Sequence, residues 1–347
     1  MLKIGEFRGS NVYFDTDNSP NKHMLILGQT GMGKSVFAQK VLLQVINLGG
    51  TVLTFDIHQT LRPEQLLETY RSEFTDFVND IDAYQKGIRF PLFTPVVGNQ
   101  MESENKYDII FATVDIFARV FNLKCRQRVA LRKAIESVFI KGTYDAEGIK
   151  AIGNELLIRD DSVSEGVSDK LYQITSRNLF RPGKFELAEN RINVVQLSKL
   201  DSDTQRLVVE IVLSYIWRLA ISGVFFDRPV YLFLDEVQNM SLGENSAVTK
   251  LLTEGRKLGV SLIIATQSLP GKSLDIQQKR LLQAGLKVFF HPIESEIPDI
   301  AKKLDSSKRR EMEALLTSLR IGEFTGIGNM ICGKGKFNIP LKISAKS

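Results

Sequence analysis

The chain has 347 residues, of which 43% are hydrophobic and 24% are charged. This balance is that of an ordinary globular protein long enough for two or three domains, and it excludes a mainly disordered chain. The formal net charge is +5, and between residues 300 and 347 ten basic residues stand against four acidic ones. Such a mild excess permits a polyanionic partner without requiring one, because a solvated basic face is its commoner meaning.

Neither a disulfide scaffold nor a metal framework is expected. The only cysteines are Cys125 and Cys332, and the three histidines are scattered, which fits a reducing compartment. The longest apolar stretch, 207–226, is interrupted by Glu210 and Arg218, so we expect no membrane span. The N-terminus lacks the apolar segment of a signal peptide. We therefore expect a soluble, cytoplasmic protein.

The first elements predicted are a strand, a loop and a helix. Residues 24–27 form a short apolar run that ends in a glycine-rich turn. Residues 35–48 then place apolar side chains at helical spacing, closed by Gly49 and Gly50. Residues 51–56 barely alternate, which is typical of a strand buried on both faces of a parallel sheet.

The middle of the chain favours helices. From about residue 61 to residue 188 the strand signal largely disappears. Amphipathic stretches occur at 108–123, 126–140, 146–158 and 163–175. The simplest interpretation is a mainly helical insertion of over a hundred residues.

Alternating strands and helices return after the insertion. Strands are expected at 193–197, 230–235, 260–266 and 287–291, with a long helix at 202–221. Together with the first elements they predict a doubly wound parallel α/β sheet. The last forty residues indicate a helix at 308–319 and a final hairpin. We expect residues 1–60 and 189–347 to form one core, interrupted by the insertion at 61–188, with a basic segment at its end.

A glycine-rich loop carries the strongest chemical signal. It fits the pattern G-x-x-x-x-G-K-[ST] after a strand and before a helix, where backbone amides surround a phosphate. The nucleotide-binding residues predicted from it are Gly28, Gln29, Thr30, Gly31, Met32, Gly33, Lys34, Ser35 and Val36. Lys34 is expected to reach the β- and γ-phosphates of ATP, and the Ser35 hydroxyl to hold Mg²⁺. The alternative is an ordinary glycine-rich turn.

Two adjacent acids end the strand expected at 230–235. Asp235 and Glu236 are placed at the carboxyl edge of the sheet, where ligands bind in open α/β folds. We predict that Asp235 completes the Mg²⁺ shell and that Glu236 is the general base. The alternative is that Asp235 only caps the next helix.

Two further polar residues lie near these acids in the sequence. Gln267 follows the next strand, within reach of the γ-phosphate or the attacking water, unless it only caps a loop. Arg256 ends a short helix. It is either a solvated cation favoured by the helix dipole or a finger that reaches a neighbouring subunit's nucleotide.

These motifs together resemble the HerA/FtsK group of DNA-pumping ATPases, whose relatives include conjugative coupling proteins. The resemblance rests on 23–35, Asp56-Ile57-His58, the strand ending in Asp235-Glu236, and the block 254–268. It covers about residues 23–290 without much of the insertion, and continues weakly at 319–324. It implies a RecA-like P-loop fold, ATP and Mg²⁺ as ligands, and a homo-hexameric ring. It also implies that Arg256 is a trans arginine finger and Gln267 a γ-phosphate sensor.

The sequence also departs from the family. Only 27 residues precede Gly28, where HerA-type proteins carry a β-barrel, and neither membrane helices nor a winged helix is found. The expectation is therefore a bare motor core with a helical insertion.

In motors of this type the loops after the catalytic strands line the pore, here 238–246 and 268–280. The second loop carries Lys272, Lys279 and Arg280, which suit contacts to DNA phosphates without base reading, or else form a solvated face. The leading hypothesis is an ATP-driven ring that translocates or remodels double-stranded DNA. The alternatives are a packaging or transfer motor of a virus or mobile element, and a ring scaffold that regulates a nuclease or another effector protein in a defence module.

Overall fold

A thirteen-stranded sheet runs through the molecule, and its centre is parallel. The computed structural model describes residues 1–347 except 67, 99–103, 238–239, 270–274 and 346–347. The parallel strands lie in the spatial order β11-β3-β10-β9-β4-β8-β5. Their bounds are β3 Met24–Leu27, β4 Thr51–Asp56, β5 Val78–Asp82, β8 Ile192–Gln196, β9 Val230–Leu234, β10 Val260–Thr266 and β11 Leu286–Phe290. The RecA-like doubly wound sheet is therefore confirmed.

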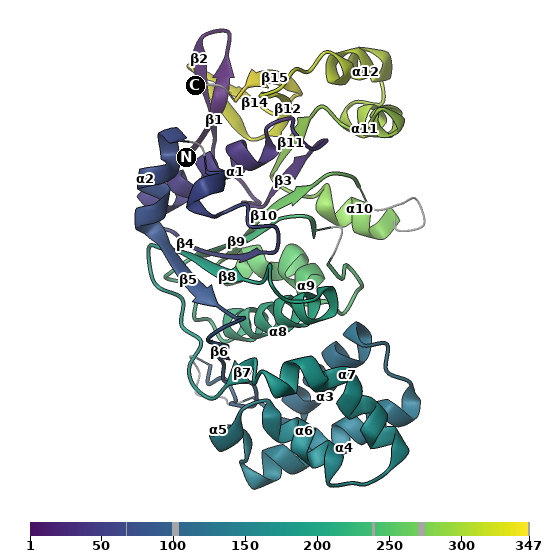
Figure 1. Cartoon of the computed structure of the whole chain (residues 1–347). Helices are drawn as coiled ribbons and strands as arrows, with labels where there is room; N and C mark the ends of the chain where they lie inside the picture. The colour runs from purple at the N-terminus through teal and green to yellow at the C-terminus, as the bar shows by residue number, and fades with distance from the viewer. Residues whose placement is uncertain (67, 99–103, 238–239, 270–274, 346–347) are drawn as a thin grey trace.

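Helices cover both faces of this sheet (Figure 1). The steps from β3 to β4 and from β4 to β5 move along the sheet in one direction, and the steps from β8 onward move back. Right-handed crossovers therefore put the helices of the two halves on opposite faces. The first half carries α1 Lys34–Asn47 and α2 Glu68–Phe77, and the second carries α8 Ser202–Ile221, α9 Ala247–Glu254 and α10 Asp275–Leu281. Two separate apolar cores result, one beneath α1 and one beneath α8.

An antiparallel extension continues the sheet beyond β11 (Figure 1). Its order is β11-β12-β15-β1-β2-β13-β14, so the first hairpin of the chain lies among the last strands. The bounds are β1 Leu2–Phe7, β2 Ser10–Phe14, β12 Glu323–Gly328, β13 Met330–Cys332, β14 Gly335–Phe337 and β15 Leu341–Ser344. Helices α11 Ile297–Leu304 and α12 Arg309–Thr317 pack beside it. The final hairpin was expected, and its pairing with an N-terminal hairpin was not.

Five helices form a separate bundle at the far end of the molecule (Figure 1). We call α3 to α7 the helical unit; their bounds are α3 Lys106–Val120, α4 Cys125–Lys141, α5 Tyr144–Glu147, α6 Lys150–Leu157 and α7 Ser162–Ser176. The chain enters and leaves it through the short parallel strands β6 Ile88–Arg89 and β7 Phe180–Arg181. Short 3₁₀ turns occur at η1 Pro63–Gln65, η3 Gly255–Leu258 and η5 Glu294–Glu296. No helix in the described ranges is both long enough and apolar enough for a membrane crossing.

The expectation that strands are lost between 61 and 188 is wrong at β5. This strand pairs with β8, Ile81 opposite Val195, and forms the edge of the main sheet. Its sequence gives a weak strand signal because an edge strand needs no continuous apolar run, and none of its five residues is fully buried. The domain bounds at 60–61 and 188–189 stay a prediction.

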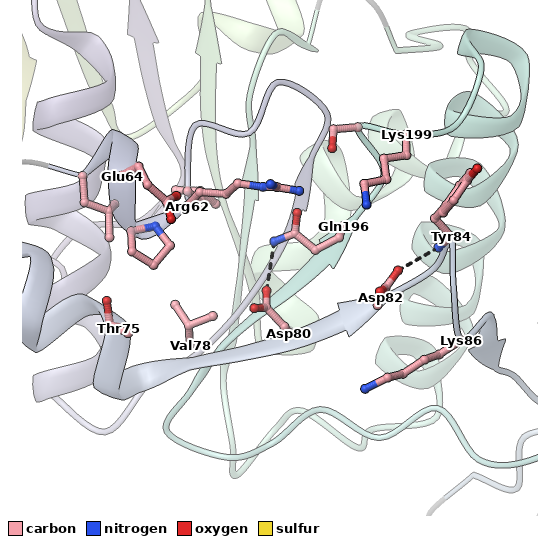
Figure 2. Close-up of a pocket in the computed structure, with 14 residues that line it drawn as sticks. Arg62, Glu64, Thr75, Val78, Asp80, Asp82, Tyr84, Lys86, Gln196 and Lys199 are labelled. Carbon is pink, nitrogen blue, oxygen red and sulfur yellow. Dashed lines mark hydrogen bonds between the residues drawn. The ribbon is translucent and has the colours of Figure 1, made fainter.

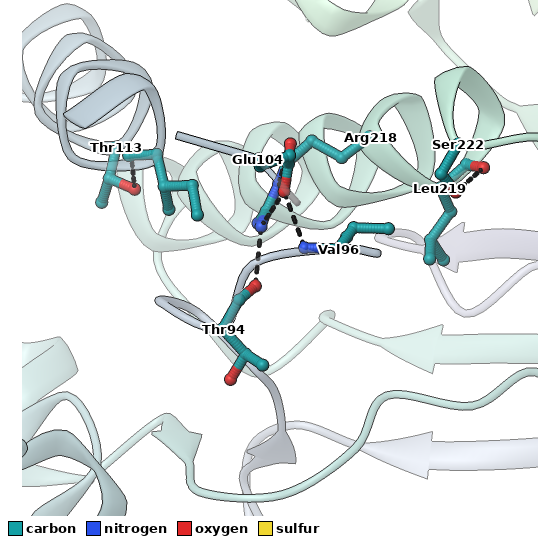
Figure 3. Close-up of polar contacts among 8 residues, drawn as sticks. Thr94, Val96, Glu104, Thr113, Arg218, Leu219 and Ser222 are labelled. Carbon is teal, nitrogen blue, oxygen red and sulfur yellow. Dashed lines mark hydrogen bonds and ion pairs between the residues drawn. The ribbon is translucent and has the colours of Figure 1, made fainter. Parts of the chain in front are cut away.

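Two ion pairs tie α8 to the helical unit and to the chain that leads into it, and Figure 3 shows the pair between Arg218 and Glu104. Arg218 donates from Nε to both Glu104 oxygens at 3.0 Å and from Nη2 to the Thr94 carbonyl at 2.8 Å. Nearer the start of α8, the Glu210 carboxylate accepts a hydrogen bond from Arg119 of α3 at 3.2 Å. Helix α8 is thus the support on which the helical unit is mounted.

Candidate active site

The loop between β3 and α1 is shaped to hold an anion. Gly31 and Gly33 have φ angles of 81° and 109°, which glycine adopts without strain. Nothing lies within 4 Å of the place where a Gly31 side chain would begin. Within the described chain the amides of Thr30, Gly31 and Gly33 donate no hydrogen bond. The amides of the first turn of α1 add further free donors, so the loop fits a phosphate group.

Lys34 is buried at the base of this loop and points back along it. Its ammonium donates to the carbonyls of Gly28 at 2.6 Å and Gln29 at 3.0 Å. Burial lowers the pKa of Lys34, while the carboxylates of Glu236 and Asp235 act to raise it. The structure therefore brings the predicted phosphate-binding cation and the two predicted acids into one electrostatic neighbourhood.

The sheet order explains how the acids reach the loop. Strand β10 lies between β3 and β9, with Thr266 opposite Leu27 and Ile264 opposite Leu234. All three strands are parallel, so their following residues meet at the same carboxyl edge. Gln267 there donates from Nε2 to Glu236 Oε1 at 2.7 Å. The predicted sensor and the predicted base are thus in direct contact.

Asp235 and Glu236 have different surroundings. Burial raises the pKa of Asp235, and Glu236 adds to this, while Lys34 and His58 lower it. Glu236 has a φ of 53°, a left-handed conformation that is uncommon for a non-glycine residue and concentrates at functional sites. Its amide donates to Asp235 Oδ1 at 3.0 Å.

Asp235 does not cap the helix α9. Helix α9 begins at Ala247, and its N-cap is Ser246, whose side chain accepts the Thr249 amide at 3.2 Å.

The residues present fit a nucleotide-bound Mg²⁺ better than a site made by protein alone. Within the described residues there is no group of three or more His, Cys, Asp or Glu side chains that could hold a metal. Ser35 is exposed at the start of α1, and Asp235 lies at the same edge of the sheet. Mg²⁺ commonly takes one or two protein oxygens and fills its octahedron with water and substrate phosphates.

Arg256 is not part of this cluster in its own chain. It lies exposed on η3, just before β10 begins, whereas the other site residues follow the ends of their strands. The seven residues of β10 separate the two edges by about 20 Å. The Arg256 guanidinium donates to the Pro20 carbonyl. Both earlier interpretations, a helix-end cation and a finger for a neighbour, are compatible with this place.

The predicted DNA-contacting residues follow the carboxyl end of β10. Lys279 is exposed on α10, and Arg280 forms an ion pair with Glu244 at 3.6 Å. Lys272 lies outside the described residues, as do Gln238 and Asn239 of the other predicted loop. The assignment of these residues to DNA binding stays a prediction.

Contacts that support the loop from other segments were not predicted. The backbone amide of Gln29 donates to the His291 carbonyl, and its side-chain Nε2 donates to the Pro292 carbonyl, both at 2.9 Å. The Gly322 amide donates to the Met32 carbonyl at 3.0 Å. Only the last of these had a signal in the sequence, since Gly322 belongs to the weak continuation of the family pattern. The loop is therefore held by chain far downstream of it.

A well-formed cavity lies elsewhere on the molecule (Figure 2). It measures about 480 Å³ and lies between β5 and the residues after β8. Asp80 and Asp82 face it from β5, with Gln196 and Lys199 opposite. None of the predicted nucleotide-binding residues lines this cavity.

Comparison with known proteins agrees with this geometry. The family described as the central domain of helicase HerA matches residues 2–216. The DNA double-strand break repair helicase HerA of Sulfolobus acidocaldarius is 25% identical over 358 residues, covering 95% of this chain and 67% of the relative. A probable helicase of Methanocaldococcus jannaschii is 24% identical, with 95% and 65% covered. The chain thus spans about two thirds of the length of these relatives.

Solved structures share the fold at low sequence identity. VirB4 of Thermoanaerobacter pseudethanolicus superposes with a TM-score of 0.75 at 20% identity, over 99% of this chain and 96% of that one. The plasmid coupling protein TrwB in complex with ADP and Mg²⁺ gives 0.64 at 15% identity, over 100% and 90%. The chain belongs to the HerA central-domain family, and it is a P-loop ATPase of the HerA/FtsK type.

Proposed function

We propose that this chain forms a homo-hexameric ring that hydrolyses ATP with Mg²⁺ and translocates double-stranded DNA in the cytoplasm. One observation carries the proposal: Lys34, Glu236 and Gln267 converge at one edge of the sheet, while Arg256 lies at the other. Each chain therefore offers an almost complete site and, about 20 Å away, a cation that its own site does not use.

The residues of the site divide the work of phosphoryl transfer to water. Lys34 and the free amides of the loop bind the β- and γ-phosphates, and Ser35 and Asp235 hold the metal. When bound, Mg²⁺ neutralises charge on the phosphate oxygens. Glu236 accepts a proton from the attacking water, and its contact with Gln267 fixes the carboxylate. Gln267 is then placed to sense whether a γ-phosphate is present.

The place of Arg256 supports the ring. An interface between a cation at one edge and a nucleotide at the other is heterologous, and copies joined through such interfaces form a ring where the rotation between subunits closes. In the ring, Arg256 of one subunit stabilises the charge that develops on the nucleotide of the next. Its bond to the Pro20 carbonyl is then exchanged for one to phosphate.

The DNA substrate is inferred from relatives and charge. Two of the proteins described above are named as helicases, one of them in double-strand break repair, and a third as a plasmid coupling protein. Lys279 and Arg280 lie on α10, the first helix after Gln267, and Lys272 stands between Gln267 and this helix in the sequence. Contacts to phosphates alone suit a motor that must pass any sequence.

The test measures ATP hydrolysis with and without duplex DNA, in wild type and in mixtures of two inactive variants. Lys34→Ala removes the phosphate-binding cation, and Arg256→Ala removes the finger, which contributes a factor of about 10³ or more in comparable enzymes. Each variant alone should be nearly inactive. A mixture should regain activity, because some interfaces then combine an intact loop with an intact finger.

Two results would contradict the proposal. If the mixture stays inactive after subunit exchange has been confirmed, Arg256 is only a helix-end cation. If duplex DNA neither binds nor changes the rate of wild type, the alternative of a ring scaffold for a nuclease or another effector replaces translocation. A salt titration of DNA binding checks the phosphate contacts, since their number sets its slope.

A further inference from the structure

His23 is a fully buried histidine at the root of the strand that leads to the phosphate-binding loop. Its Nδ1 accepts the Leu262 amide of β10 at 3.0 Å, and its carbonyl accepts the Leu286 amide of β11 at 3.2 Å. Its own amide donates to Asn21 Oδ1 at 2.9 Å. His23 thus joins β3 to both of its neighbouring strands at the edge opposite the loop.

The imidazole also faces the end of α9. Because Nδ1 accepts a hydrogen bond, the neutral ring carries its proton on Nε2. Burial lowers the pKa of His23 to about 4, and the Arg256 guanidinium also lowers it, while the Leu252 and Leu251 carbonyls of α9 act to raise it. The Leu252 carbonyl lies in the last turn of α9, where helix carbonyls lack partners within the helix, and the His23 Nε2 atom is buried with no hydrogen-bond partner among the described residues, so a neutral ring N–H suits this place.

The turn that carries Arg256 is fixed on its other sides. The Gly255 amide donates to the Leu251 carbonyl, and η3 ends at Gly259 in a left-handed conformation. A side chain at Gly259 would begin 2.0 Å from the Phe225 carbonyl, so the backbones are in close contact. Pro20, three residues before His23, accepts from the Arg256 guanidinium. The segment 20–23 therefore accepts the Arg256 side chain at Pro20 and places the His23 ring beside the last carbonyls of α9, the helix that leads into the Arg256 turn.

We propose that His23 is the positioning residue for Arg256, and that it links the finger offered to a neighbour with the chain's own phosphate-binding loop. The link is the four-residue strand β3, which begins directly after His23 and ends directly before Gly28. This inference rests on the proposed trans role of Arg256.

The test variant is His23→Asn, which keeps an acceptor near the Nδ1 position and loses the ring atoms that face α9. We expect kcat for ATP to fall about tenfold while KM and ADP affinity change less than twofold. In an Arg256→Ala background the same substitution should cause no further loss of rate. Thr54→Val is the matched control, because Thr54 is fully buried on β4 and its hydroxyl has no described partner; its rate should equal that of wild type.

Subunit mixing separates the finger from the loop. His23→Asn subunits keep an intact loop, so mixing them with Lys34→Ala subunits should raise the rate per His23→Asn subunit. Mixing them with Arg256→Ala subunits should give no rise. The reverse pattern would show that His23 acts on its own loop and would overturn the inference.

The remaining outcomes are also decisive. An equal loss of rate in the wild-type and Arg256→Ala backgrounds would overturn the inference while the finger stands. If Arg256→Ala hydrolyses ATP at the wild-type rate, Arg256 is not a finger, and both that role and the inference are overturned. If His23→Asn does not fold, His23→Gln is measured in its place, since its longer amide offers both an acceptor and a donor.

Discussion

Replacing Arg119 by methionine should loosen the helical unit from α8. At 3.2 Å the Arg119–Glu210 pair attracts with about 5 kcal/mol for an effective dielectric constant of about 20. Most of this offsets the desolvation of Glu210, whose side chain is 6% exposed. Removing the arginine alone leaves that desolvation in place, which costs about 3–5 kcal/mol for fully buried pairs.

Two features of this pair reduce the cost. The Arg119 side chain is 32% exposed, so water already screens the interaction. Burial raises the pKa of Glu210, and losing Arg119 raises it further, so the folded variant can take up a proton. We therefore expect a loss of about 2 kcal/mol at pH 7. Because the folded state binds that proton more readily than the unfolded state, the difference from wild type should narrow as pH falls towards 5.

Tryptophan fluorescence during urea unfolding measures this loss. Trp217 is the only tryptophan of the chain, and it lines a cavity of about 220 Å³ together with Arg119 and Glu210. Urea is preferable to guanidinium, whose salt would screen the pair. Arg128→Met is the control, because it removes an exposed pair between Arg128 of α4 and Asp115 of α3 and should cost less than about 1 kcal/mol.

The reasoning would be refuted by equal losses for Arg119→Met and Arg128→Met. It would also be refuted if the effects of Arg119→Met and Glu210→Gln simply add in the double variant, since neighbours in one ion pair should be coupled.

Three further predictions concern the site and its supports. Glu236→Gln should bind ATP as wild type does but hydrolyse it about 10²–10⁴-fold more slowly, because the amide cannot accept the proton; lost binding in a filter assay would instead assign Glu236 to the metal. The free energy of unfolding of the wild type should rise by about 3 kcal/mol between pH 4 and 6.5. In this pH range His23 binds a proton in the unfolded chain, whereas burial keeps it neutral in the folded chain. His23→Asn should flatten that rise in urea titrations, and an unchanged slope would show that other groups cause it. Gly259→Ala should cost at least about 3 kcal/mol, since its φ is 78° and its side chain would meet the Phe225 carbonyl. Gly142→Ala, with a φ of 66° and open space, should cost about 1 kcal/mol; equal losses would contradict the steric argument.

The sequence predicted the central strands because they are buried on both faces. Strands β3, β4, β9 and β10 are apolar runs, and their polar ends mark the carboxyl edge of the sheet. Strand β5 has no such signal, because it lies at an edge and exposes Asp80. The N-terminal hairpin could not be predicted to join the C-terminal strands, because that pairing depends on register between segments at opposite ends of the sequence.

The sequence predicted which residues form the site, but not how they are arranged in space. The spacing around Lys34 and the acids after β9 identify the chemistry from local pattern alone. The place of Gln267 between them depends on β10 lying between β3 and β9, which no local pattern specifies. The distance of Arg256 from its own loop depends on the same topology. The contact from Gly322 to the loop depends on chain almost three hundred residues away.

The interleaved ends of the sheet impose an order on folding during synthesis. Strand β15 pairs with β1 on one side and β12 on the other, so it fills the gap between the first hairpin and the rest of the sheet. At about 5–20 residues per second, translation of the intervening chain takes tens of seconds. During that time the β1 edge has no native partner, and open edges invite pairing with other chains. Gly322, which supports the phosphate-binding loop, also arrives only in this last stretch, where its carbonyl accepts the Ala345 amide at 2.7 Å. The phosphate-binding loop of the nascent chain therefore gains its contact with Gly322 only when this part of the sheet forms.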